Sequence, residues 1–172
     1  AHFAALGILR PPENGEYLMP FDAYRQSLRL GDDDDLQFSS LRYTLAYRPW
    51  RAVEHPRIAR WLEKNEKPLA LAASAIMRPK FYSPIRPGEG VSNLFLPEMS
   101  GCHDVVHTLA IRAMLHTGEG RFDEAWTDLQ ICFRLARHLG NAPSLYAHLT
   151  GMGIEIRAAA ATASFAGCVE AS

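Results

Sequence analysis

Three shortages in the sequence narrow the class of protein before any motif is considered. The three cysteines are too few and too far apart for a disulfide framework. The longest apolar runs, near residues 69–73 and 158–161, are far shorter than the roughly 20 residues that a membrane-spanning helix needs. The 18 basic and 19 acidic residues leave a net charge of -1, whereas a nucleic-acid-binding domain normally carries a basic face. The sequence therefore predicts neither a nucleic-acid partner nor a membrane span, and it leaves the compartment open.

The sequence does contain enough apolar material for a stable core. Hydrophobic residues make up 48% of the 172 positions, a content that excludes intrinsic disorder. A chain of this length can bury about 70% of the surface that its unfolded form exposes. Because the chain begins with Ala1 and not with Met, we expect it to be a processed or truncated piece of a larger chain.

Proline is almost absent from the second half of the chain. Ten of the eleven prolines lie at or before Pro97, and only Pro143 follows. Because proline interrupts helices, residues 1–97 are predicted to form short helices with Pro-rich arms. Residues 98–172 are predicted to form a helical hairpin followed by one long helix. We expect the two parts to make one continuous globular unit of the all-α class, an antiparallel helical bundle.

The first predicted helices surround a run of four aspartates. One helix is predicted from Phe21 to about Leu30, where Gly31 ends it. Residues 32–35 are predicted to be a solvated loop, because adjacent carboxylates repel each other. Calcium binding is the alternative for this run, but the alternating spacing and closing glutamate of a helix-loop-helix calcium site are absent. Residues 36–47 fit a helix or a strand, and the spacing of their apolar residues favours a helix.

Two prolines mark the starts of further helices. Pro56 occupies a first-turn position, where its missing N–H costs nothing, and an apolar face follows it. Pro68 opens a second helix that is rich in small residues and ends before Pro79. Residues 78–97 combine four prolines with several large apolar side chains, which would lose roughly 1.5 to 3 kcal/mol each if left in water. We therefore predict an ordered Pro-rich arm that lies across the helices.

Two amphipathic segments in the C-terminal part predict an antiparallel hairpin. Residues 101–117 are apolar around much of the helix circumference, which indicates a central helix. The TGEG tetrad at 117–120 then supplies a tight turn, and a second helix follows from Arg121 to Gly140. We expect the inner stripe of the second helix to consist of Phe122, Ala125, Trp126, Leu129, Phe133 and Ala136. We expect its outer side to carry Asp123, Glu124, Thr127, Asp128, Arg134 and Arg137.

The hairpin at residues 107–140 resembles one tetratricopeptide repeat (TPR), a 34-residue helix-turn-helix unit of protein-binding solenoids. The matching positions are Leu109, Ala113, Gly120, Phe122, Ala125, Leu129, Cys132 and Phe133. Arg112, His116 and Arg137 depart from the motif. The resemblance implies TPR-like packing and a small uncharged binding groove lined by His107, Ala110, Met114 and Thr117. The segment from Trp50 to Leu69 and the GEGRFDEAW turn are also similar to segments of large uncharacterised bacterial proteins.

The last segment is predicted to be one long helix. It runs from Pro143 to about Ala166 and has small residues that allow close approach of a neighbouring helix. Its large apolar residues recur at helical spacing, and we expect this face to cover the hairpin. The face comprises Leu145, Leu149, Met152, Ile156, Ala160 and Ala163.

One cluster of side chains could carry chemistry. His103 and His107 are four residues apart, so they share one helix face and could bind one metal ion. Cys102 and Asp104 point about 100° to either side of His103, so a third ligand would have to come from another part of the fold. The alternative is that both histidines are ordinary, partly exposed side chains. No catalytic residue, metal or cofactor is predicted.

Function is therefore expected to lie in binding and not in catalysis. The leading hypothesis is a helical binding or structural module that acts in protein–protein interaction or in self-assembly. The alternative hypothesis is a helical enzyme or metal protein that uses His103 and His107.

Overall fold

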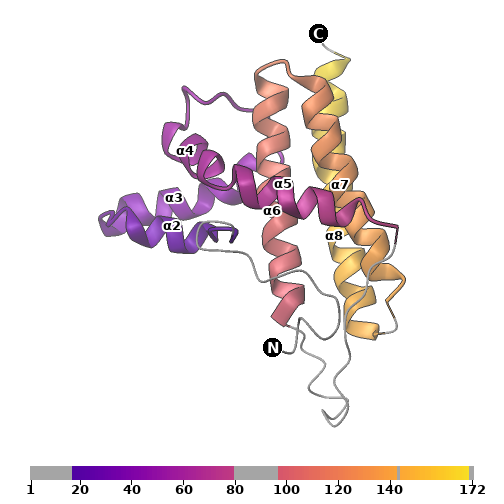
Figure 1. The fold of residues 1–172 in the computed structure, drawn as a ribbon. Helices are drawn as coiled ribbons and strands as arrows, with labels where there is room; N and C mark the ends of the chain where they lie inside the picture. Colours follow the sequence, from indigo (N-terminus) through magenta and orange to yellow (C-terminus); the bar gives the residue numbers. More distant parts are fainter. Residues whose placement is uncertain (1–16, 80–96, 143, 171–172) are drawn as a thin grey trace.

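The computed structural model describes residues 17–79, 97–142 and 144–170, and within these ranges every regular element is an α-helix (Figure 1). The predicted all-α class is confirmed. The predicted Pro-rich arm at 78–97 lies almost wholly outside the described residues. The helices are α2 (Phe21–Ser27), α3 (Asp32–Leu45), α4 (Pro56–Lys64), α5 (Glu66–Ile76), α6 (Pro97–Gly118), α7 (Phe122–Gly140) and α8 (Leu145–Val169).

The three C-terminal helices form an antiparallel bundle in which each contacts the other two (Figure 1). The turn between α6 and α7 depends on Gly120, whose φ of +74° lies in the left-handed region that favours glycine. The N–H of Arg121 donates to the carbonyl oxygen of His116 at 2.8 Å and closes this turn. Ala113 and Ala125 are fully buried. The predicted hairpin is therefore confirmed.

The N-terminal helices pack across this bundle and share a core with it. Figure 1 shows α5 crossing the long helices, with α2 and α3 lying to one side. Trp50 joins the two parts: its backbone N–H donates to the carbonyl oxygen of Met114 at 3.3 Å, and its indole Nε1–H donates to that of Ile111 at 3.2 Å. One buried cluster holds Phe21, Trp50 and Trp61 together with Ala113 and Met114.

The acidic run at 32–35 is helical, so its prediction as a loop is wrong. Gly31 precedes the first turn of α3, and all four aspartates lie within that turn. Carboxylates near a helix N-terminus interact favourably with the partial positive charge of the unpaired N–H groups. Arg25 also forms an ion pair with Asp35. These two attractions outweigh the repulsion among the carboxylates. Residues 36–45 continue the same helix, as their apolar spacing favours.

α8 is the predicted long helix, but the side that we expected to be buried is exposed and a different side is buried. Its buried side consists of Ala147, Thr150, Gly151, Ile154, Ala158 and Ala161. The large residues that were expected to cover the hairpin are exposed, with exposed fractions of 74% for Leu145, 55% for Leu149, 50% for Met152 and 69% for Ile156. Ala160 and Ala163 lie on the same exposed side. The reason is close packing: a Cβ at Gly151 would lie 2.7 Å from the carbonyl oxygen of Ala136 on α7. Only small side chains fit such a contact.

Candidate functional site

The predicted groove on α6 is not open in the structure. Met114 is fully buried, and Ala110 and Thr117 are 3% and 5% exposed. Leu45 and Trp50 belong to the same buried cluster as Ala110 and Met114, so the N-terminal part covers this face of the hairpin. The Thr117 hydroxyl donates to the carbonyl oxygen of Ala113 at 2.8 Å. Of the predicted binding residues, His107 alone borders a cavity among those described below.

We call this cavity the histidine cleft. It has a volume of about 220 Å³ and lies where α3, α6 and α8 meet. Its polar lining comes from Arg42 and Tyr43 on α3, from His103, Asp104 and His107 on α6, and from Arg157 on α8. The structure therefore brings together three members of the predicted cluster. Cys102, the fourth, lines a different hollow, between α5 and α6.

Both imidazoles of the histidine cleft are held in the neutral form. Burial, together with the positive charges of Arg42 and Arg157, lowers the pKa of His107 to about 4. Burial and Arg157 also lower the pKa of His103. Nδ1 of His103 and Nε2 of His107 are buried and have no hydrogen-bond partner in the described part of the chain. Burial raises the pKa of the Asp104 carboxyl.

The two arginines of the histidine cleft have different surroundings. Arg42 donates to Asp22 at 3.0 Å, and its guanidinium lies 4.6 Å from the centre of the Tyr43 ring. Within residues 17–79, 97–142 and 144–170, Arg157 has no carboxylate within ion-pair distance. The cleft thus holds one guanidinium group that no carboxylate of the described residues pairs with.

The charges of the histidine cleft do not favour a metal ion. Two guanidinium groups beside two imidazoles repel a cation. No group of three or more His, Cys, Asp or Glu side chains gathers into a possible metal site in the described ranges. The geometry therefore gives no support to the alternative hypothesis of a metal protein built on His103 and His107.

A buried ion pair joins α6 to α7 and was missed by the sequence interpretation. Arg112 donates to Asp128 through Nε at 2.8 Å and through a terminal nitrogen at 2.6 Å. The Asp128 side chain is only 4% exposed, so its predicted place on the outer side of α7 is wrong. The signal that could have found this pair is the arginine at a usually apolar position of the repeat. Trp126, expected in the buried stripe, is 42% exposed and stacks on Phe165.

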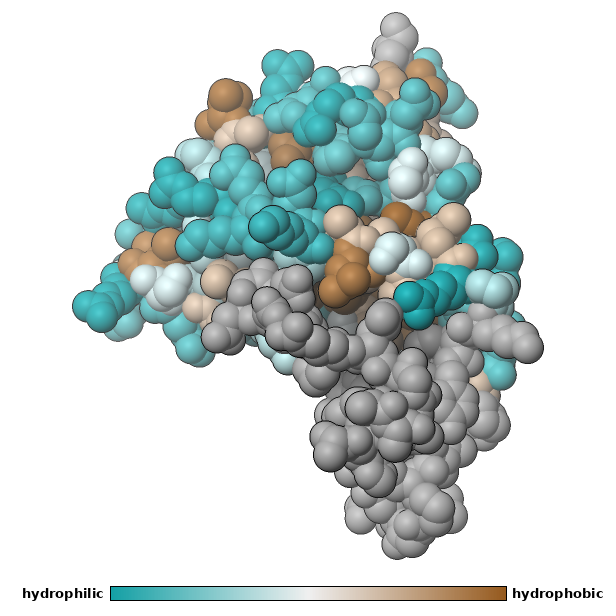
Figure 2. Space-filling model, viewed as in Figure 1, coloured by the Kyte–Doolittle hydropathy of each residue, from teal (hydrophilic) through white to brown (hydrophobic). Residues whose placement is uncertain are grey.

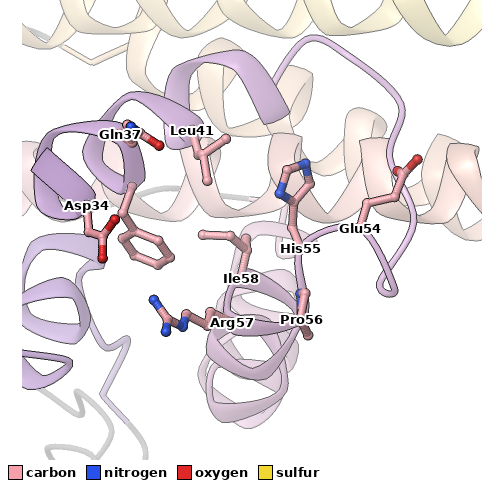
Figure 3. Close-up of a pocket in the computed structure, with 9 residues that line it drawn as sticks. Asp34, Gln37, Leu41, Glu54, His55, Pro56, Arg57 and Ile58 are labelled. Carbon is pink, nitrogen blue, oxygen red and sulfur yellow. The ribbon is translucent and has the colours of Figure 1, made fainter. Parts of the chain in front are cut away.

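A second cavity, of about 430 Å³, opens between α3 and the start of α4. Figure 3 shows Asp34 and Arg57 at one end, His55 at the other, and the apolar side chains of Leu41 and Ile58 between them. The charges along this cavity have both signs and are carried by exposed side chains. They do not converge on one point, so the arrangement suggests no particular ligand.

The four large apolar side chains that are most exposed in the C-terminal bundle form one row, which we call the outer face of α8. It consists of Leu145, Leu149, Met152 and Ile156, spaced four, three and four residues apart. This is the spacing at which side chains line one side of a helix and form the seam of a coiled coil. The face shown in Figure 2 differs: it is mainly hydrophilic over α2 to α4, with a few scattered apolar residues, and it has one small apolar group near the middle.

Comparisons with protein families, with curated proteins and with solved structures find no match for this chain. Among the described helices, none is both long and apolar enough to cross a bilayer. Function must therefore be inferred from the surfaces and cavities described above.

Proposed function

We propose that this protein is a helical self-assembly module that pairs with a second copy through the outer face of α8. The observation that carries the proposal is the exposure of four large apolar side chains in one row, each at least half exposed. Single exposed apolar residues are ordinary, but a continuous row of them is typical of an interaction surface. The resemblance of residues 107–140 to a protein-binding repeat points in the same direction.

An antiparallel pairing centred on Met152 matches the outer face of α8 to itself. Positions about equally far from the centre then come nearly level, so Leu149, three residues before Met152, lies beside Ile156 of the second copy, four residues after it. Leu145 lies beside Ala159 of the second copy, where a small side chain leaves room. All four large residues are covered by this one arrangement.

Polar groups at the edge of this face fit the same pairing. His148 and Glu155 are seven residues apart, so they lie on one edge of α8. In the antiparallel pair, His148 approaches Glu155 of the second copy, and symmetry repeats the contact. Nδ1 of His148 lies 2.9 Å from the carbonyl oxygen of Gly140 and donates to it, so Nε2 can donate to the carboxylate when the ring is protonated. The contact is then a charge-assisted hydrogen bond.

The size of the proposed α8–α8 interface sets the expected affinity of the dimer. Residues 145–159 span about 22 Å of helix, and a single helix pair of this length lies at the low end of interface sizes, below about 1,200 Å². We therefore expect a reversible dimer with a dissociation constant on the order of micromolar.

Sedimentation equilibrium over a wide concentration range tests the proposal. We expect a monomer–dimer equilibrium for the wild type, a monomer for Leu149→Glu, and an unchanged equilibrium for Leu36→Glu. Leu36 is the matched control because it is also an exposed leucine on a helix, at 68%, but lies on α3. Circular dichroism should show that both variants are folded. A wild type that stays monomeric at millimolar concentration, or equal weakening by both substitutions, contradicts the proposal.

A further inference from the structure

We propose that the histidine cleft binds the carboxylate of a small organic acid, with Arg157 as the main contact. Nothing in this inference depends on pairing of α8. Arg157 is two residues from Glu155, which is about 200° around the helix, so the two side chains lie on opposite edges of α8. The cleft stays accessible whether or not the outer face of α8 is covered.

Arg157 supplies the charge that an anion requires. Arg42 is already engaged with Asp22, whereas Arg157 has no carboxylate within ion-pair distance in the described part of the chain. A guanidinium group presents parallel N–H donors whose spacing matches the two oxygens of a carboxylate. An incoming carboxylate would therefore pair with a guanidinium group that no carboxylate of the described residues contacts.

The two histidines supply hydrogen-bond donors. A neutral imidazole has one N–H donor and one acceptor, and either nitrogen can carry the hydrogen. Nε2 of His107 and Nδ1 of His103 are buried without a partner among the described residues, a situation that costs about 1 to 3 kcal/mol for a polar group. Both atoms are buried in the structure, so a small turn of either ring towards the cleft would let a carboxylate oxygen accept from it and would remove this cost.

The remaining lining selects a monocarboxylate over a phosphate. Asp104 lies in the same cavity and repels an anion of higher charge. Phe21 and Trp61, both buried, form the floor of the cavity, and the exposed ring of Tyr43 offers aromatic surface to the body of the ligand. The volume of about 220 Å³ is below the range of about 300 to 1,000 Å³ that is usual for drug-sized ligands. These features fit a small acid with a flat or short apolar body.

Titration followed by NMR of the histidine ring signals tests this inference. Benzoate is the probe, inorganic phosphate the competing anion class, and Arg157→Gln the decisive variant. We expect benzoate to shift the His103 and His107 signals saturably, with affinity lowered about tenfold or more in Arg157→Gln. Arg137→Gln is the matched control, because Arg137 is an exposed arginine of α7 that does not line the cleft. Its benzoate affinity should equal that of the wild type.

Three results would overturn the inference. One is the absence of saturable shifts with benzoate. Another is equal affinity in Arg157→Gln and Arg137→Gln, which would remove Arg157 from the site. The third is tighter binding of phosphate than of benzoate, which would contradict the assigned ligand class. Thermal melts of the variants separate a lost site from a lost fold, and His107→Gln, which keeps a neutral polar side chain, gives a second measure of the same site.

Discussion

α7 contacts its two neighbours in different ways. Against α6 it makes one buried ion pair, Arg112 with Asp128. Against α8 it comes so close that Gly151 meets the backbone of Ala136 and Gly140. The first contact has room for two charged side chains between the helices, whereas the second leaves no room for a side chain at Gly151. This difference explains why the large apolar residues of α8 point outward, where they are available to a partner.

The largest expected effect comes from breaking the ion pair between α6 and α7. Asp128→Ala should lower the free energy of unfolding by about 3 kcal/mol, since Arg112 would be left partly buried without its partner. Urea unfolding measures this loss, and Asp123→Ala, an exposed change in the first turn of α7, is the control. The double variant Arg112→Met with Asp128→Leu should recover much of the stability, because it removes both charges. Equal stability of Asp128→Ala and Asp123→Ala would show that the ion pair does not stabilise the contact between α6 and α7.

An effect of up to the same size should appear when pH is lowered, and it arises on the side of α6 that faces α3 and α8. The pKa of His107 is about 4 in the folded protein and about 6.5 in an unfolded chain. Between these values the unfolded state binds more protons, so stability is fully present above about pH 6.5 and is lost as pH falls towards 4. The loss from His107 alone is up to about 3 kcal/mol.

His107→Gln tests the pH effect, because glutamine is polar but does not titrate. Urea unfolding between pH 4 and 7 should show a weaker pH dependence in this variant than in the wild type. Some dependence should persist, because burial also lowers the pKa of His103 and of His116. The assignment to His107 fails if the slopes of His107→Gln and the wild type coincide.

The hairpin could be predicted from sequence because its signals are local. Gly120 marks the turn, and Ala125 and Leu129 repeat at helical spacing on one side of the next helix. The acidic run at 32–35 misled the interpretation because repulsion between carboxylates was considered without their attraction to a helix N-terminus. Local patterns therefore gave the position of the turn but misassigned the start of α3.

The candidate sites were harder to predict because they depend on neighbouring elements. Which side of α8 is buried depends on how closely α7 approaches it. A prediction from hydrophobicity alone placed the large apolar residues on the buried side, and they are exposed. Met114 and Thr117 were expected in a groove, but Trp50, distant in sequence, lies over that face. His103, Asp104 and His107 were correctly grouped, yet their chemistry depends on Arg42 and Arg157, which come from α3 and α8.

The contact between α7 and α8 can be probed by adding a single methyl group at either of two glycines of α8. At Gly151 a Cβ would lie 2.7 Å from the carbonyl oxygen of Ala136 and 2.9 Å from the backbone nitrogen of Gly140, and neither backbone can move away cheaply. Gly151→Ala should therefore destabilise the protein by about 1 to 3 kcal/mol, although alanine is the better helix former. At Gly153, two residues further along, a Cβ meets no atom within 4 Å.

Gly153→Ala is thus the matched control, and its expected effect has the opposite sign. It should stabilise the protein by about 0.5 to 1 kcal/mol, because alanine loses less backbone entropy than glycine in a helix. Urea unfolding of the two variants side by side measures both effects. If Gly151→Ala is as stable as Gly153→Ala, then α8 does not approach α7 closely. In that case nothing would prevent its large residues from turning inward, and the outer face of α8 would lose its physical basis.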